Sequence, residues 1–402
     1  RPHRYVSTVL TAANHQQTIM SLAELSQTPQ PRRIGSIDAL RGINMFWLFG
    51  VNGAAAALAQ MTSGKGPIVS GVGSFLGGQF VHVSWQGLHF YDLIFPLFIF
   101  VTGISIVLSL PRMVERDGEA TAHWRVVRRS LLLFGLGLIA SGNIGQQLWD
   151  VRWLGVLQRI AICYFFTSVL FLNFNLRGMI TAFVGLLIGY WAIMTFVPVP
   201  GIGAGSFAAD TNLANWIDRN YLPGKLYDFT RDPEGILSTL PAIGTCLLGV
   251  FAGLFMRDSQ VSPQRKTVWL TAAGCALLAV GYLWALQFPV IKAIWTSSYV
   301  LVTGGYSVLL LAALHQIVDV WGARRWATVF TWIGANAIAL YFLNELLSYQ
   351  DVASRIVGAH VSGLLDRTVA PGTGNFVIAL LALGFAVLLA RYLYNRKIFV
   401  RV

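Results

Sequence analysis

The chain has few charged residues and few cysteines. Asp, Glu, Lys and Arg make up 11% of its 402 residues, whereas soluble domains carry about 25%. This composition excludes an ordinary soluble domain. The three cysteines, Cys163, Cys246 and Cys275, all fall inside apolar runs, so a disulfide framework is not expected. No Cys/His spacing suggests zinc, and we predict no metal site.

Long apolar runs occupy most of the chain. Hydrophobic residues make up 55% of it, and the mean hydropathy is +0.61. Repeated runs of about 20 apolar residues are typical of transmembrane helices. We therefore predict an all-α polytopic membrane protein. Its ten expected spans are 39–60, 89–110, 126–142, 152–173, 176–197, 235–256, 267–288, 296–318, 327–349 and 375–395.

The distribution of basic residues predicts the orientation. With ten spans both termini share one side, which holds 20 of the 29 Lys and Arg residues. Because cytoplasmic loops are enriched in Lys and Arg, both termini are predicted to be cytoplasmic. We interpret the net charge of +12 as this signal and not as nucleic-acid binding. Residues 1–33 are expected to form a flexible cytoplasmic tail, and 34–402 one transmembrane domain. The absence of any N-x-Ser/Thr sequon favours a bacterial inner membrane protein.

Two ionisable residues lie at the extracytoplasmic start of the second span, His82 and Asp92. An Asp at a helix centre in a bilayer costs about 2.5–3.5 kcal/mol, so such groups pair, line a cavity or do chemistry. On one continuous helix the two side chains would point about 280° apart. Their pairing therefore requires a break before the span, which Gly87 permits. The alternative is that His82 is an interfacial histidine beside Trp85, an aromatic-belt residue.

The first span carries a polar stripe. Asp38 and Arg41 are neighbours at i, i+3 on a helix. Arg41 and Asn52 lie within about 20° of the same direction and about 16 Å apart along the axis. Together with Asn44, these residues form either a polar track for a ligand from the cytoplasm or an Asp–Arg cap with helix-bridging asparagines.

Later spans add further polar groups. Arg159 lies about one and a half turns into its span and requires an acidic partner or an anionic ligand. Asp232, Pro233 and Glu234 are typical of an N-cap, a first helical proline and a first-turn acid. Capping explains these three residues without catalysis. Asn336 stands in the ninth predicted span.

Several short motifs follow one another along residues 36–300. They are Ser36–Gly42 (SIDALRG), Val51–Gly53 (VNG), His82–Gly87 (HVSWQG), Asp92–Phe100 (DLIFPLFIF), Gly155–Ile160 (GVLQRI), Asp232–Leu240 (DPEGILSTL) and Lys292–Leu301 (KAIWTSSYVL), with a weaker Gly334–Asn336 (GAN). This pattern resembles the heparan-α-glucosaminide N-acetyltransferase family and its bacterial relatives. The lysosomal members are similar only over the membrane region and carry an additional lumenal domain ahead of it, which leaves the natural acceptor open.

The resemblance implies acetyl transfer across the membrane. Its donor would be cytoplasmic acetyl-CoA, and its acceptor the amine of a glucosamine-type sugar on the other side; it also implies a homodimer. By motif alignment, the catalytic histidine falls on His82, its partner aspartate on Asp92 and the pocket asparagine on Asn52. The residues expected to bind the cofactor are Asp38, Arg41, Arg128, Arg129 and Arg159. Those expected to bind the sugar are Trp85, Glu234, Lys292 and Asn336.

The residue types suit this chemistry. A neutral imidazole can take a proton from the attacking amine, or can itself attack the thioester and form an acetyl-imidazole. Asp92 would orient the ring, and an amide N–H of Asn52 would stabilise the oxyanion, an effect worth about 3 kcal/mol. Two other interpretations remain open. One is a sugar or anion transporter with His82, Asp92 and Arg159 as a proton relay, and the other is a membrane O-acyltransferase of an envelope glycan.

Overall fold

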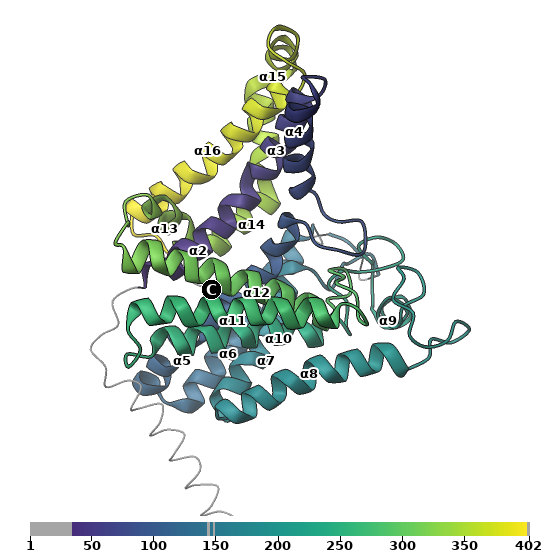
Figure 1. The fold of residues 1–402 in the computed structure, drawn as a ribbon, viewed down its shortest axis with the longest axis vertical. Coiled ribbons are helices and arrows are strands. Elements are labelled where there is room, and N and C mark those ends of the chain that lie inside the picture. The colour runs from purple at the N-terminus through teal and green to yellow at the C-terminus, as the bar shows by residue number, and fades with distance from the viewer. Residues whose placement is uncertain (1–33, 143–144, 148, 400–402) are drawn as a thin grey trace, which may run out of the picture.

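The computed structural model describes residues 34–142, 145–147 and 149–399 (Figure 1). Within these ranges the chain forms helices and loops, with isolated β-bridges such as Gln86 to Ile291 but no strand. The prediction of an all-α protein is therefore confirmed. The predicted tail 1–33 lies outside the described residues.

The helices follow one another along the chain, and Figure 1 labels most of them. Before the first long loop come α2 (Gly35–Phe46), η1 (Trp47–Val51), α3 (Asn52–Thr62), α4 (Pro67–Gln79), η2 (Phe90–Leu93), α5 (Ile94–Asp117), α6 (Glu119–Ala140), α7 (Val156–Asn173) and α8 (Leu176–Phe196). After it come α9 (Leu213–Tyr221), α10 (Thr239–Arg257), α11 (Pro263–Trp284), α12 (Ser297–Leu314), η3 (His315–Val320), α13 (Ala327–Ala335), α14 (Ala337–Leu347), α15 (Tyr349–Thr368) and α16 (Thr373–Asn395).

Nine of the ten predicted spans correspond to helical segments that are long and apolar enough to cross a membrane. In the described part of the chain, eight helical segments are long and apolar enough to cross a membrane, and α13 with α14 would make a ninth, although this pair is bent by 73°. The remaining predicted span, 126–142, falls on α6, whose first half carries Arg125, Arg128 and Arg129 and is not an apolar run. The ninth predicted span is not continuous either, because its two helices meet at a sharp bend at Asn336.

A helical bundle forms the larger part of the molecule. The helices α5, α7, α10 and α12 contribute most of its buried apolar residues, including Phe100, Leu247 and Val302. Two glycines permit the closest contact, because a Cβ at Gly103 on α5 or Gly249 on α10 would collide with the backbone of the other helix. Such small residues let membrane helices approach closely and gain van der Waals contact.

A second helical group extends away from the bundle and contains α3, α4, α15 and α16 (Figure 1). A second apolar cluster joins α15 and α16 of this group to α2, η1, α13 and α14, and in it Phe49, Leu340 and Ala382 are buried. The chain passes from the bundle into this group through η1, a π-helical segment between α2 and α3. The helices α4, α9 and α15 belong to no predicted span; α4 and α9 lie in the connecting segments 61–88 and 198–234.

Candidate active site

The loop between α4 and α5 brings His82 to Asp92. The Asp92 side chain is completely buried, and its Oδ1 lies 2.7 Å from His82 Nδ1. Its Oδ2 accepts the backbone N–H groups of Val83, at 3.2 Å, and His89, at 3.0 Å. Gly87 adopts a φ of 115°, a left-handed conformation that glycine reaches without steric cost. The predicted break before α5 is therefore present, and it pairs the two residues.

These contacts define how the imidazole is used. We assign the proton of the neutral ring to Nδ1 of His82, because a carboxylate only accepts hydrogen bonds and Asp92 lies 2.7 Å from this nitrogen. Nε2 is then the unprotonated nitrogen. The His82 side chain is 54% exposed, so a reacting group can reach it. The arrangement provides a proton acceptor held in one tautomer by a buried carboxylate.

Lys292 completes this cluster from the loop between α11 and α12. Its Nζ lies 3.1 Å from Asp92 Oδ1 and 2.8 Å from His82 Nδ1. Burial lowers the pKa of Lys292 from its usual range, and the Asp92 carboxylate only partly offsets this. An ammonium at this position neutralises the charge of the buried Asp92 carboxylate. Lys292 was predicted to bind the sugar, and the structure places it against the imidazole.

Asn52 lies on the other side of the cluster, at the start of α3. Its Oδ1 accepts the N–H of Gly53 at 2.8 Å, and its Nδ2 donates to the Tyr91 hydroxyl at 3.2 Å. The Tyr91 ring contacts the His82 ring, with 4.7 Å between centroids. The sequence analysis did not select Tyr91, because a tyrosine inside an apolar motif is typical of packing. Its position next to Asp92 was the one feature of the sequence that could have indicated a role in the site.

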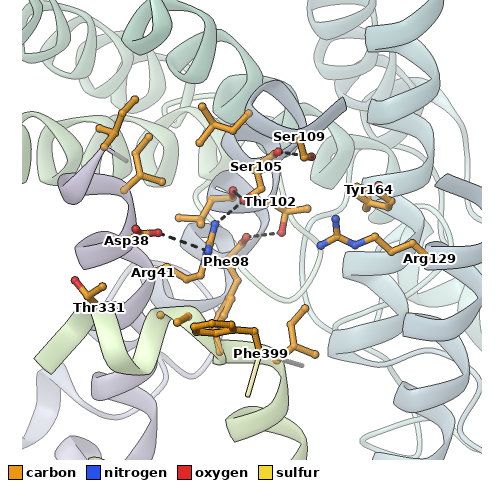
Figure 2. Close-up of a pocket in the computed structure, with 18 of the residues that line it drawn as sticks. Asp38, Arg41, Phe98, Thr102, Ser105, Ser109, Arg129, Tyr164, Thr331 and Phe399 are labelled. Atoms are coloured by element: carbon orange, nitrogen blue, oxygen red, sulfur yellow. Dashed lines mark hydrogen bonds and ion pairs between the residues drawn. The ribbon is translucent and has the colours of Figure 1, made fainter. Parts of the chain in front are cut away.

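A cavity of about 480 Å³ lies along the far half of α5, between α2, α7, α13 and α14 (Figure 2). Arg41 projects into it and donates to Ser105 Oγ at 2.8 Å, and Asp38 lies 4.0 Å from the same guanidinium. The predicted Asp38–Arg41 pair is present. Arg112, which the sequence analysis did not select, also lines the cavity.

Arg129 reaches this cavity from α6 and lies over the Tyr164 ring, 4.6 Å from its centroid (Figure 2). Its buried Nε has no hydrogen-bond partner among the described residues. The neighbouring Arg128 is exposed and does not line the cavity. The structure therefore brings only Arg129 to the cavity, because consecutive helical residues point about 100° apart, and cofactor binding by Arg128 stays a prediction.

The α5 helix connects the two sites. Asp92 precedes its first residue, and Ser105 faces the cavity thirteen residues further on. At about 1.5 Å per residue, this separation is about 20 Å along the axis. The cavity and the His82 cluster are therefore two ends of one helix, which a long, thin ligand could span.

Arg159 lies elsewhere. It is 1% exposed, does not line the cavity, and donates to the carbonyl of Gly235 and the hydroxyl of Ser238. Its guanidinium also lies 5.1 Å from the centroid of the Trp295 ring. The structure does not bring Arg159 to the cavity, because α7 directs this side chain towards the 235–238 turn, and cofactor binding by Arg159 stays a prediction. Its Nε and Nη1 have no hydrogen-bond partner among the described residues.

The residues expected to cap α10 do not do so. That helix begins at Thr239, and Asp232 instead accepts two hydrogen bonds from Arg152 in a loop. Arg152 also contacts Glu234 Oε2 at 2.6 Å. Burial raises the pKa of Glu234, and its arginine neighbours only partly offset this. The Asp232 carboxylate also accepts the backbone N–H groups of Glu234, at 3.0 Å, and Tyr227, at 3.1 Å, so it stabilises a turn ahead of α10 and not the first turn of that helix.

Two other predicted sugar-binding residues have partners within the chain. Trp85 donates from Nε1 to the carbonyl of Phe207 at 2.9 Å, and its ring faces Arg231. Asn336 is 1% exposed at the bend between α13 and α14, and it donates to the carbonyl of Ile398 at 3.0 Å. The structure does not bring Asn336 to the His82 cluster. These contacts give both residues a structural role.

Known proteins match this chain over a region that includes His82, Asp92 and the cavity residues of α2, α5, α6 and α7. A family model described as "Heparan-alpha-glucosaminide N-acetyltransferase, catalytic" matches residues 33–285. The human protein named heparan-alpha-glucosaminide N-acetyltransferase is 30% identical over 375 residues, which is 79% of this chain and 53% of the human one. The mouse protein of the same name is 29% identical over 382 residues, 80% of this chain and 56% of the mouse one. The chain thus spans about half the length of these curated relatives. Since the family model covers more than half of the chain, this protein belongs to the heparan-alpha-glucosaminide N-acetyltransferase family.

Proposed function

We propose that this protein is a transmembrane N-acetyltransferase that moves an acetyl group from acetyl-CoA to the amine of a glucosamine-type sugar. The observation that carries the proposal is the His82–Asp92–Lys292 cluster at one end of α5, with an arginine-lined cavity at the other. The match to a family model of N-acetyltransferases supports the reaction class, acetyl transfer to a nitrogen.

The cavity suits the nucleotide end of acetyl-CoA. Arg41, Arg112 and Arg129 can pair with its phosphates, because arginine forms strong charge-assisted hydrogen bonds with phosphate oxygens. The pantetheine arm would then extend along α5 and carry the thioester towards His82. We propose that acetyl-CoA enters from the cytoplasm and that the sugar binds on the extracytoplasmic side, as the distribution of Lys and Arg predicts.

The His82 cluster would perform the transfer in two steps, attack by the amine and loss of the thiolate. The sugar amine attacks the thioester carbonyl carbon, and His82 Nε2 takes the proton that the nitrogen loses. The carbon–sulfur bond then breaks, and His82 returns that proton to the departing thiolate. The products are an N-acetyl sugar and CoA with a free thiol. Attack by His82 itself, with an acetyl-imidazole intermediate, uses the same atom as nucleophile.

Charge near His82 supports an amine acceptor. An ammonium cannot attack a carbonyl, since its nitrogen has no lone pair. The positive charge of Lys292 next to His82 favours the neutral form of a nearby amine. The buried carboxylate of Asp92 would stabilise the imidazolium that forms when the proton is taken.

Transfer of labelled acetyl groups tests the proposal. Purified protein is incubated with acetyl-labelled acetyl-CoA and glucosamine, and the product is analysed for N-linked and O-linked label. We expect label on the sugar nitrogen, with CoA released in equal amount. Label on a hydroxyl would support an O-acyltransferase instead. Uptake of unmodified sugar by proteoliposomes, without any transfer, would support a transporter.

A further inference from the structure

The hydroxyl of Tyr91 is positioned beside His82 and has a proton that no described group accepts. It receives the Nδ2–H of Asn52 at 3.2 Å, which uses one of its lone pairs. A phenol can also donate one hydrogen bond. No acceptor for this donor occurs among the described residues, whereas the equivalent hydroxyl of Tyr299 donates to the Asp92 carbonyl at 2.8 Å.

The Asn52 amide is held in a fixed orientation. Its Oδ1 is bound by the N–H of Gly53 at 2.8 Å, so its NH₂ group points towards Tyr91. One of the two N–H bonds of this group is used by the tyrosine, and the second is available. Asn52 and Tyr91 therefore provide two unused hydrogen-bond donors, one on the amide nitrogen and one on the phenol oxygen, 3.2 Å apart. Both lie next to the His82 ring, which would take the proton.

We propose that the Tyr91 O–H and the second Asn52 N–H together bind the acetyl oxygen of the thioester while it carries negative charge. This inference rests on the proposed acetyl transfer. When the amine attacks, the carbonyl oxygen becomes an oxyanion, and it returns to a carbonyl when the carbon–sulfur bond breaks. Neither donor gives up its proton in the process. Fixed donors of this kind stabilise the transition state because they need no reorientation as the charge develops.

The ring of Tyr91 has a separate role from its hydroxyl. It lies against His82 with 4.7 Å between centroids and an interplanar angle of 39°. An aromatic face next to an imidazole stabilises the protonated ring and restricts its motion. Replacement by phenylalanine keeps this contact and removes only the donor. The variant Tyr91→Phe thus isolates the hydroxyl.

A double-mutant cycle distinguishes a direct donor from a residue that only orients Asn52. The proteins are the wild type, Tyr91→Phe, Asn52→Ala and the double variant, all full-length and purified. Removal of one oxyanion donor commonly lowers kcat by about 100-fold or more. We expect about this loss in each single variant, and a further large loss in the double variant. The Kd for CoA and the position of the acidic limb of the pH–rate profile should stay unchanged.

The outcomes separate this inference from the proposed function. A wild type that transfers no acetyl group to glucosamine overturns both. An active wild type with an equally active Tyr91→Phe overturns the role of Tyr91 alone, as does a double variant no slower than Asn52→Ala, because the tyrosine would then act only through the asparagine. Tyr306→Phe is the matched control. Its hydroxyl contacts Tyr282 at 3.2 Å, away from His82, and full activity is expected.

Discussion

The two ends of α5 differ in how far their charged side chains are already paired. At the loop end, Asp92 is fully buried and contacts the His82 ring, the Lys292 ammonium and two backbone N–H groups. At the cavity end, the buried Nε of Arg129 has no partner among the described residues. The side chains at the loop end are therefore held in place before any ligand binds. The cavity end keeps an unused hydrogen-bond donor, with which a ligand can pair.

This difference has a physical reason. A reacting group must be in place when charge develops, so its partners are best provided by the protein itself. A binding group gains most from partners that the ligand brings. An unsatisfied buried donor costs about 1–3 kcal/mol, and an anionic phosphate that pairs with it recovers this cost. The comparison predicts that changes at the loop end affect kcat and that changes at the cavity end affect the affinity for acetyl-CoA.

The largest effect is expected from His82→Ala. Loss of a general base lowers rates by about 10²–10⁴-fold, and kcat should fall by this factor while the Kd for CoA stays within about twofold. Transfer assays and calorimetry with CoA measure the two quantities. His360→Ala is a control for a histidine outside the cluster, at an exposed position on α15. Substantial activity in His82→Ala would contradict the assignment.

The cavity end is tested by Arg129→Gln. Hydrogen bonds to charged groups contribute about 1.5–3 kcal/mol, so the KM for acetyl-CoA should rise by about 10–100-fold with little change in kcat. Arg128→Gln removes the same charge from the same helix, but from an exposed position. This control should behave as the wild type. Equal effects of the two substitutions would show that only net charge matters and that the cavity does not hold the phosphates.

Lys292→Met gives a smaller, diagnostic effect. A positive charge beside a base disfavours the protonated form of that base, so removal of the Lys292 ammonium should shift the acidic limb of the kcat/KM profile to higher pH. At the optimum pH the rate should fall by about tenfold or less. Lys225→Met, in a different loop and over the Phe229 ring, should leave the profile unchanged. A shift to lower pH would contradict the electrostatic role given to Lys292.

The smallest effect concerns stability. Burial raises the pKa of Asp218 to about 6, so the folded protein holds this proton more tightly than the unfolded chain does. Stability should therefore fall as the pH rises from about 4 to 6 and stay lower above it. Asp218→Asn can still accept the N–H of Ile236, which lies 2.8 Å away, and should remove this fall.

Thermal melting in detergent between pH 4 and 7.5 measures the difference. At pH 7.5 the Asp218→Asn variant should be more stable than the wild type by at most about 3 kcal/mol. Asp228→Asn alters an exposed aspartate that pairs with Arg231 and should keep the wild-type fall with pH. A steeper fall in Asp218→Asn would contradict the prediction.

Local sequence signals predicted the parts of the molecule that depend on nearby residues. Apolar runs located most spans, and the i, i+3 spacing predicted the contact of Asp38 with Arg41. The break at Gly87, required for His82 to meet Asp92, is also local. In contrast, Lys292 is 200 residues from Asp92 in the chain, and only the packing of α11 and α12 against α5 brings it there.

The differences between prediction and structure have a common origin. Arg159 and Arg128 were selected for their charge, but the direction of a side chain depends on how its helix is rotated in the bundle. The residues around Asp232 have the composition of a helix start. In the structure, however, the Asp232 carboxylate binds Arg152 from another loop, and no helix begins there. Tyr91 was missed because packing and hydrogen bonding use the same residue type. Tertiary contacts decide each of these cases.

The π-helical segment η1 determines how Arg41, at one end of α5, is oriented relative to Asn52, at the other end. It joins the helix that carries Arg41 to the helix that begins with Asn52. Deletion of one residue between Trp47 and Val51 would leave Arg41 in place and swing Asn52 by about 100°, away from Tyr91. The length of this short segment therefore fixes the distance and angle between Arg41 in the cavity and Asn52 at the proposed site of acetyl transfer.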